Sequence, residues 1–235
     1  AVGYYAAAVN LVESLGVVPG AFMMSVFPLL SKYFETSKDM HRKVYQLSFK
    51  YMTIFIIPIA VGTTLLAKPI VRLIYGDQFL PSVSALQILI WSEVFVFIGI
   101  INNQILISAN KQKIDFIFTS ISAVVNVILN LLLIPIYGVV GAGVATVISY
   151  AVGPVIGFFL STTRDYSISA FSSMVRPGVA SVVMGIYIYY IFSSSLLWLV
   201  VIVPILYFGI LFLIKGITEE DIKILKSLSS WEVAL

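Results

Sequence analysis

The stretch Asn126–Tyr150, NVILNLLLIPIYGVVGAGVATVISY, places two apolar segments around a Pro-Ile-Tyr-Gly turn and contains no charged residue. A turn in water normally carries charged side chains, so this pattern predicts a helical hairpin within or against a membrane. After the turn, a small residue recurs at every fourth position: Gly141, Ala145, Ser149, Gly153 and Gly157. Such a stripe lets a second helix approach closely, so we predict a helix-packing face with a kink at Pro154.

The composition extends the membrane prediction to the whole chain. Its 235 residues are 60% hydrophobic and 11% charged, with a mean hydropathy of +1.05, whereas soluble domains have about 45–50% apolar and about 25% charged residues. There is no cysteine, and hence no disulfide frame or thiolate metal site. We expect membrane lipids as surroundings, and no cofactor, metal or nucleic acid. The chain starts at Ala1 and enters an apolar segment almost at once, so we expect it to be part of a longer protein.

Seven segments are long enough to cross the hydrocarbon core, which takes about 20 apolar residues. They predict an all-α, polytopic membrane bundle of seven transmembrane helices: Tyr4–Leu30, Leu47–Leu66, Val83–Ala109, Ile114–Ile136, Val139–Leu160, Ser172–Ile191 and Leu196–Ile214. The intervening Ala67–Pro81 is too short to span, and we expect it on the outer interface. Of the 14 basic residues, only Lys68 and Arg72 fall on one side of this topology. The positive-inside rule then predicts a multi-pass plasma membrane protein with its N-terminus outside and its C-terminus in the cytoplasm.

Polar side chains inside the predicted helices are the candidates for function, because each is costly in lipid unless it is paired or faces water. Glu13 and Glu93 are each read either as a cation or proton site in a cavity, or as a structural hydrogen-bonding group. Asn103 and Gln104 are further cavity candidates. Asn102, Asn103 and Gln104 are consecutive, so they point in different directions and cannot share one site, and at least one of the three is expected to bond a neighbouring helix.

One predicted helix carries a continuous polar face. Its members are spaced 4, 3, 4 and 4 residues apart: Asp115, Thr119, Ser122, Asn126 and Asn130. The face either lines a hydrated cavity or substrate path, or supplies hydrogen bonds between helices, worth about 0.6 kcal/mol each. Its length favours the cavity. No G-x-S-x-G, H-E-x-x-H or Walker sequence occurs, so we predict no enzyme.

A series of ordered motifs runs from residue 2 to about residue 160. They are VGYYAAA at 2–8, FPLLS at 27–31, LIYGDQF at 73–79, NQILISANKQK at 103–113 and the hairpin at 126–150. In order and spacing they resemble the C-terminal half of polysaccharide biosynthesis flippases, the Wzx or RfbX-like exporters of the MATE-like multidrug/oligosaccharidyl-lipid/polysaccharide superfamily. The resemblance implies a five-helix C-lobe at 1–160 and two further helices at 161–214. A polar cytoplasmic tail would follow at 215–235.

The resemblance also implies a function. Such proteins export a glycan linked to polyprenyl phosphate or pyrophosphate by alternating access, and H⁺ or Na⁺ is a candidate for the driving ion. A missing N-terminal lobe or partner chain would complete the cavity. This chain has no basic residue in mid-helix, so we expect the groups that bind the anionic head group in that missing part, and Glu13 in ion coupling. A MATE-type drug or metabolite antiporter, a lipid II-type flippase and a structural half-subunit remain alternatives.

Overall fold

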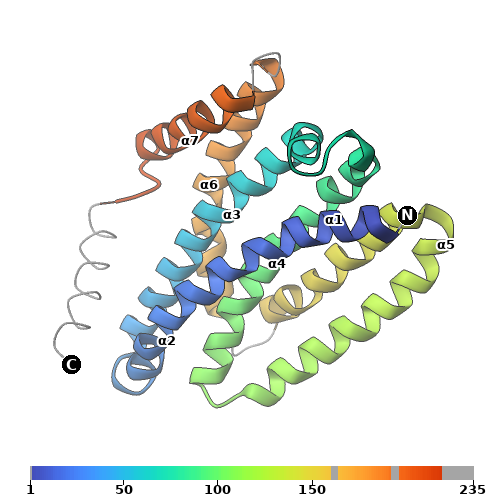
Figure 1. The fold of residues 1–235 in the computed structure, drawn as a ribbon. Coiled ribbons are helices and arrows are strands. Elements are labelled where there is room, and N and C mark those ends of the chain that lie inside the picture. Colours follow the sequence, from blue (N-terminus) through green and yellow to red (C-terminus); the bar gives the residue numbers. More distant parts are fainter. Residues whose placement is uncertain (1, 160–163, 192–195, 219–235) are drawn as a thin grey trace.

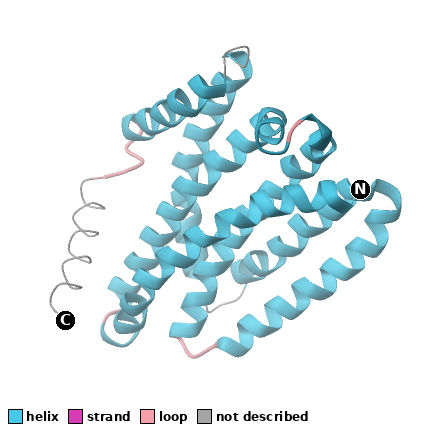
Figure 2. Ribbon diagram, viewed as in Figure 1, coloured by secondary structure: helices cyan, strands magenta, loops and turns pink. Residues whose placement is uncertain are grey.

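Helices make up nearly all of the computed structural model, which describes residues 2–159, 164–191 and 196–218 (Figures 1 and 2). The elements in chain order are α1 (Val2–Glu13), η1 (Ser14–Gly16), α2 (Val17–Thr36), α3 (Lys38–Tyr75), η2 (Asp77–Ser82), α4 (Val83–Ser108), α5 (Gln112–Phe159), α6 (Arg164–Ile191) and α7 (Leu196–Leu213). The all-α prediction is confirmed. Most of the predicted tail at 215–235 lies outside the described residues.

Five helical stretches are long and apolar enough to cross a membrane. They are Val2–Thr36, Lys38–Tyr75, Asp77–Ser108, Gln112–Phe159 and Phe171–Tyr190. The count differs from seven because α5 contains both arms of the predicted hairpin, and because the described apolar part of the last helix, Ile202–Leu213, is short. The number of membrane crossings therefore stays a prediction.

The α5 hairpin reverses at one glycine. Gly138 has φ 55° and ψ −127°, a conformation that residues with a side chain rarely adopt. The two arms, residues 112–137 and 139–159, run back along each other (Figure 1). A Cβ atom at Gly141 would overlap the carbonyl oxygen of Leu133, so the chain after the turn packs against the end of the first arm without room for a side chain.

The first membrane-length stretch is interrupted in its middle. The α-helical pattern stops after Glu13, continues as the 3₁₀ turn η1, and resumes as α2. Pro19 lacks the N–H group that would bond the Leu15 carbonyl, and Gly16 lowers the local helix propensity, so the 3₁₀ turn at Ser14–Gly16 includes both Leu15 and Gly16. The interruption places Glu13 at the end of a helix and not within one.

Helix α3 is longer than the sequence predicts. It extends beyond Leu66 to Tyr75, where Gly76 ends it with φ 83°. The predicted outer-interface segment is therefore partly a continuation of α3, followed by η2. The extension is held by Ala67 and Val71, one turn apart and both buried, while the neighbouring Leu73 is exposed.

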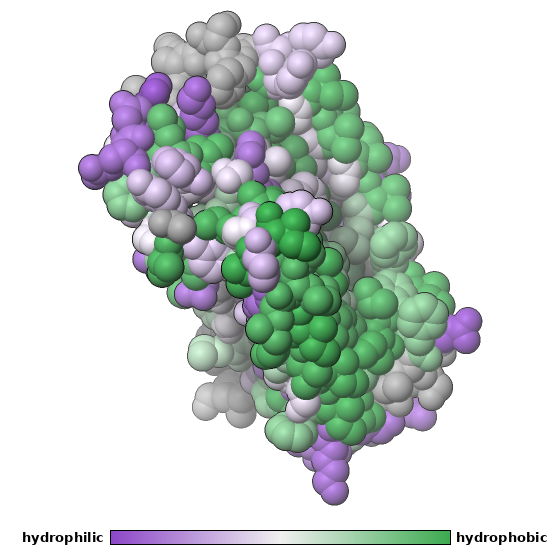
Figure 3. All heavy atoms as spheres, turned by 90° about the vertical axis from the view of Figure 1, so that its right-hand side faces the viewer, coloured by the Kyte–Doolittle hydropathy of each residue, from purple (hydrophilic) through white to green (hydrophobic). Residues whose placement is uncertain are grey.

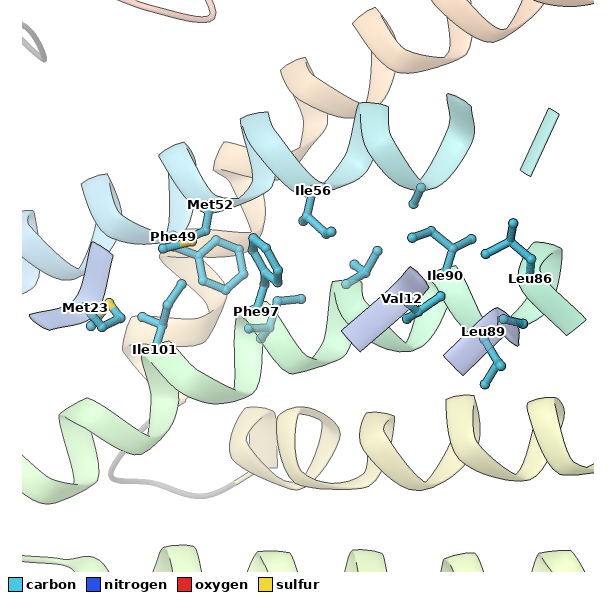
Figure 4. Packing of buried hydrophobic residues seen from close by; sticks show 14 of the residues in the cluster. Val12, Met23, Phe49, Met52, Ile56, Leu86, Leu89, Ile90, Phe97 and Ile101 are labelled. Atoms are coloured by element: carbon cyan, nitrogen blue, oxygen red, sulfur yellow. The ribbon is translucent and has the colours of Figure 1, made fainter. Parts of the chain in front are cut away.

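The main core lies between α3 and α4 and is covered by α1 and α2 (Figure 4). Side chains from α3 and α4 interdigitate there: Phe49, Met52 and Ile56 face Ile90, Phe97 and Ile101. A second core joins α3, α6 and α7. In it, the buried Tyr207 hydroxyl donates a 2.8 Å hydrogen bond to the Ile54 carbonyl. That carbonyl lacks its usual helical donor because residue 58 is proline, so Tyr207 satisfies a group that Pro58 left free.

The outer surface suits a lipid environment. The side of the molecule that carries the α5 hairpin is broadly apolar, and hydrophilic side chains gather toward its ends (Figure 3). The first arm of α5 contributes many exposed apolar residues, among them Phe116, Ile117, Val124, Leu131 and Ile136. A patch of this extent on a protein in water would be covered by a partner, whereas lipid covers it without cost.

Candidate functional site

A cavity of about 480 Å³ lies among α1, α4 and the two arms of α5. Its lining mixes polar and apolar groups: Tyr5, Val9, Val12 and Glu13 from α1; Leu89, Ser92 and Glu93 from α4; Thr119, Ser122, Ala123 and Asn126 from the first arm; and Thr146, Ser149 and Tyr150 from the second. An adjoining cavity of about 290 Å³ shares Thr119, Ser122 and Tyr150 with it. Polar groups from four helical segments thus converge on one space inside an apolar bundle.

The structure brings most of the candidate residues from the sequence to these two cavities. Glu13, Glu93, Thr119, Ser122 and Asn126 line the larger one, and Asn103 and Asp115 line the smaller. The polar face of the first arm reaches the cavities because residues spaced three or four apart share one side of a helix.

Two candidates lie elsewhere, because neither Gln104 nor Asn130 lines either cavity. The Asn130 side-chain amide donates a 2.9 Å hydrogen bond to the Asn126 side-chain oxygen one turn earlier. Asn130 thereby fixes the side-chain oxygen of a lining residue from one turn further along the same helix.

The predicted packing stripe on the second arm is largely buried. Gly141, Ala145, Ser149 and Gly157 are buried, and Gly153 is half-buried. Its neighbour Gly143 lies against Ile88 of α4, where a Cβ would come within 3.2 Å of the isoleucine side chain. Ser149 and Gly153 also line the larger and the smaller cavity respectively. Gly153 of the stripe lies against Phe118 of the first arm, whose Cβ would be 4.0 Å from a Cβ added at Gly153, so the stripe faces both a helix contact and the cavity wall.

Two carboxylic acids lie in the larger cavity in different surroundings. Glu93 is 5% exposed, and its Oε2 atom has no hydrogen-bond partner in the described structure. Glu13, at the end of α1, is exposed. Among the described residues that line this cavity, there is no lysine, arginine or histidine. An ionised carboxylate in such a place lacks the partner that normally offsets its desolvation.

Hydrogen bonds connect the helices around the cavity. The Tyr5 hydroxyl of α1 lies 3.2 Å from the Thr146 hydroxyl of α5. Thr146 donates its hydrogen to the Ala142 carbonyl, so Tyr5 is the donor in the contact between the two hydroxyls. This bond joins the interrupted first stretch to the second arm of the hairpin.

Sequence reasoning missed four polar residues that line the larger cavity: Tyr5, Ser92, Thr146 and Tyr150. The sequence contains two signals that could have found three of these residues. Thr146 and Tyr150 are four residues apart on the second arm, and Ser92 directly precedes Glu93. Tyr5 gave no such signal, because its role depends on α1 packing beside the hairpin.

Comparison with a family model and with curated proteins finds similarity to flippases. The family model described as lipid II flippase MurJ matches residues 1–209. Among curated proteins, the chain is 28% identical to the probable low-salt glycan biosynthesis flippase Agl15 of Haloferax volcanii, over 76% of this chain and 40% of that protein. It is also 28% identical to lipid II flippase MurJ of Bacillus subtilis, over 63% of this chain and 29% of that protein. It thus spans less than half the length of these relatives.

A solved structure has the same fold. The lipid II flippase MurJ in an inward closed conformation superposes with a TM-score of 0.74 at 20% identity, over 91% of this chain and 47% of that one.

These findings confirm the flippase superfamily inferred from the ordered motifs, but they point to MurJ and not specifically to the Wzx or RfbX-like branch. The finer assignment to the Wzx or RfbX-like branch stays a prediction, because short motifs on similar helices are shared across related lobes. Since the matching family model covers residues 1–209, this chain is a member of the lipid II flippase MurJ family of integral membrane proteins.

Proposed function

We propose that this chain forms one part of a flippase that moves a glycan linked to polyprenyl phosphate or pyrophosphate across the plasma membrane. The observation that carries the proposal is the polar cavity among α1, α4 and α5, in a chain of the MurJ family. A glycan head group needs hydrogen-bonding partners that the hydrocarbon core lacks. Relatives described as glycan and lipid II flippases support this substrate class. A polysaccharide precursor is our first candidate, and a lipid II-type substrate is the alternative.

The proposed cycle is alternating access without covalent chemistry. Residues 1–160 would form one lobe, residues 161–214 would add two helices beside it, and residues 215–235 would form a cytoplasmic tail. A second lobe or a partner chain would face the cavity and complete the substrate path. The share of the relatives that this chain spans, 40% of Agl15 and 47% of the solved MurJ chain, supports that arrangement. Because the described cavity lining has no basic residue, the groups that bind the anionic head group would come from the other lobe.

A second candidate function is that of a MATE-type antiporter for organic cations. The acidic lining favours it, because Glu13 and Glu93 would attract a cationic substrate and repel an anionic one. The family match favours the flippase. Uptake assays with radiolabelled organic cations distinguish the two: a flippase of glycans leaves such cations untransported.

The cavity can be tested through Asn126. In the full-length protein, we expect Asn126→Leu to lower the rate of glycan flipping in proteoliposomes about tenfold, because one lost hydrogen bond to a polar head group is worth about 1.5 kcal/mol. The matched control is Val127→Leu, on the adjacent residue, which is exposed toward the lipid side. Normal flipping by Asn126→Leu, at equal protein amount, would remove the cavity from the substrate path.

A further inference from the structure

We propose that a groove among α3, α4 and the second arm of α5 binds one membrane phospholipid with an anionic head group, and that Lys68 contacts the phosphate of this lipid. The groove shares no lining residue with the two cavities described above. The proposal concerns a lipid of the surrounding membrane and not a transported molecule, so it does not rest on the function proposed above.

The groove lies on the outer surface of the bundle and has a volume of about 470 Å³. Sites for small ligands usually have volumes of about 300–1,000 Å³. Residues three or four apart on α4 and on the second arm share one helix face each. The lining consists of Thr64 from α3, Gln87, Ile88 and Trp91 from α4, and Val144, Val147 and Ile148 from the second arm. Trp91 is 38% and Ile148 is 43% exposed, so a lipid can enter from the side.

Three polar side chains form a cluster at the α3–α4 wall of this groove. The Trp91 indole N–H donates to the Thr64 hydroxyl at 3.1 Å, and the Gln87 amide donates to the Thr64 carbonyl at 3.0 Å. The Thr64 hydroxyl itself donates to the Ala60 carbonyl at 2.7 Å. A side-chain amide has two N–H donors and one oxygen acceptor, so Gln87 keeps one N–H and its oxygen for a ligand. Hydrocarbon offers no partner to these groups, whereas a lipid head group does.

The groove lies at the depth where head groups meet acyl chains. Trp91 is eight residues into α4, and Ile148 is ten residues beyond the turn at Gly138. At about 1.5 Å per residue, these positions are about 12 Å and about 15 Å from that end of the bundle. The head-group region occupies about 5–8 Å on each side of the hydrocarbon core, and tryptophan is enriched at the boundary between them.

Lys68 supplies a positive charge beside the groove. It is exposed and has no hydrogen-bond or ion-pair partner in the part of the chain that the structure describes. Lys68 follows Thr64 by one turn on the same face of α3, and side chains on a helix lean toward its N-terminus, so the lysine can reach back over the groove. Arg72, one turn further along, is bonded to Asp77 at 2.6 Å, so that pair adds little net charge.

An anionic phospholipid complements all three parts of this site. Its phosphate offsets the charge of Lys68, its glycerol region accepts a hydrogen bond from the Gln87 amide, and its acyl chain covers the apolar wall at Val144 and Val147. A soluble anion would leave that wall uncovered. An apolar ligand without a phosphate would leave the charge of Lys68 without a partner.

Photolabelling tests the site. The full-length protein would be placed in phosphatidylcholine nanodiscs with a trace of phosphatidylglycerol that carries a diazirine near the top of one acyl chain. Peptide mass spectrometry should find the adduct on residues 144–148. Lys68→Gln should lower its yield about fivefold, the usual effect of one basic residue near an anionic lipid surface. Lys68→Arg, which keeps the charge, should retain the yield.

Matched variants separate a specific site from general attraction. Arg72→Gln removes a charge from the same end of α3, but one already offset by Asp77, and should leave the yield unchanged. Val147→Phe fills the groove without changing a charge and should lower the yield, whereas Val127→Phe on the exposed side of the first arm should not.

Three results would overturn the proposal. Equal yields for the natural protein and Lys68→Gln would remove the lysine from the site. Equal losses in Lys68→Gln and Arg72→Gln would show only a general attraction of anionic lipid to this end of the protein. Displacement of the labelled lipid by an equal amount of polyprenyl phosphate would make a substrate-like lipid the occupant. Labelling requires no transport, so a labelled protein that flips no glycan contradicts only the proposed function.

Discussion

Gly138 shows how one residue determines the shape of the hairpin. Its φ of 55° combined with ψ of −127° lies where a Cβ atom is strained, and the two arms of α5 separate at this residue. The space around it is open, because no heavy atom lies within 4 Å of a Cβ built there. The free-energy cost of a side chain at position 138 would therefore come from backbone strain and not from a steric clash with neighbouring atoms.

We expect Gly138→Ala to destabilise the protein by about 1–3 kcal/mol, the usual cost of a residue in such a backbone region. The measurement is thermal unfolding in detergent, followed by circular dichroism. Gly62→Ala in α3 is the matched control, since Gly62 has equally open surroundings and no positive φ. That change should be neutral or slightly stabilising. Equal melting temperatures for the two variants would contradict the strain argument.

Helix α3 depends on a hydrogen bond from a side chain of another helix. Pro58 leaves the Ile54 carbonyl without its helical donor, and the Tyr207 hydroxyl of α7 donates to it at 2.8 Å. The same proline lines an apolar cavity of about 250 Å³ between α3 and α7, together with Tyr207. The Tyr207–Ile54 hydrogen bond and this cavity thus lie at the same contact between α3 and α7.

This contact predicts a coupled pair of substitutions. Tyr207→Phe should cost about 1–3 kcal/mol, because it leaves the Ile54 carbonyl unsatisfied. In a Pro58→Ala background, the alanine N–H group can bond that carbonyl, so the same Tyr207→Phe change should cost much less. A double-mutant cycle of unfolding free energies measures the difference. Additive effects would show that Tyr207 does not replace the donor lost at Pro58.

The helices show what the sequence can and cannot predict about the site. Thr119, Ser122 and Asn126 could be grouped from spacing alone, because they share one face of one continuous helix. Tyr5 and Thr146 could not be paired, because they are 141 residues apart and meet only through the packing of α1 on the hairpin. Asn130 shares this spacing but bonds Asn126 and lines neither cavity, a distinction that the spacing alone does not give.

Boundaries were predictable only where a breaker marks them. The hairpin turn was anticipated from the Pro-Ile-Tyr-Gly sequence, and Gly138 reverses the chain there. The predicted end of the second segment at Leu66 was too early, because hydropathy falls at Lys68 while burial of Ala67 and Val71 carries α3 on to Tyr75. Tertiary packing, which the sequence does not display, outweighed local polarity.

The lengths and faces of the two α5 arms bear on how many times the chain crosses the membrane. The arms of α5, residues 112–137 and 139–159, would be about 39 Å and about 32 Å long at about 1.5 Å per residue. Each exceeds the hydrocarbon thickness of about 30 Å. The polar face of the first arm lines the cavities while its opposite face is exposed and apolar. Both facts favour two separate crossings, and with them the seven-helix topology.

The absence of cysteine from the sequence allows a direct test of this topology. Single variants Lys43→Cys, Lys113→Cys, Asp77→Cys and Tyr137→Cys place a thiol at exposed positions in four different turns or helix ends. With a membrane-impermeant maleimide, we expect the first two to react only from the cytoplasmic side and the last two only from outside, because basic residues stay on the cytoplasmic side. Ile101→Cys, in the buried main core, should react from neither side. If the thiols at positions 113 and 137 reacted from the same side, the first arm of α5 would not cross the membrane. The cavity that it lines would then open onto one leaflet only, and a substrate path through this lobe would lose its basis.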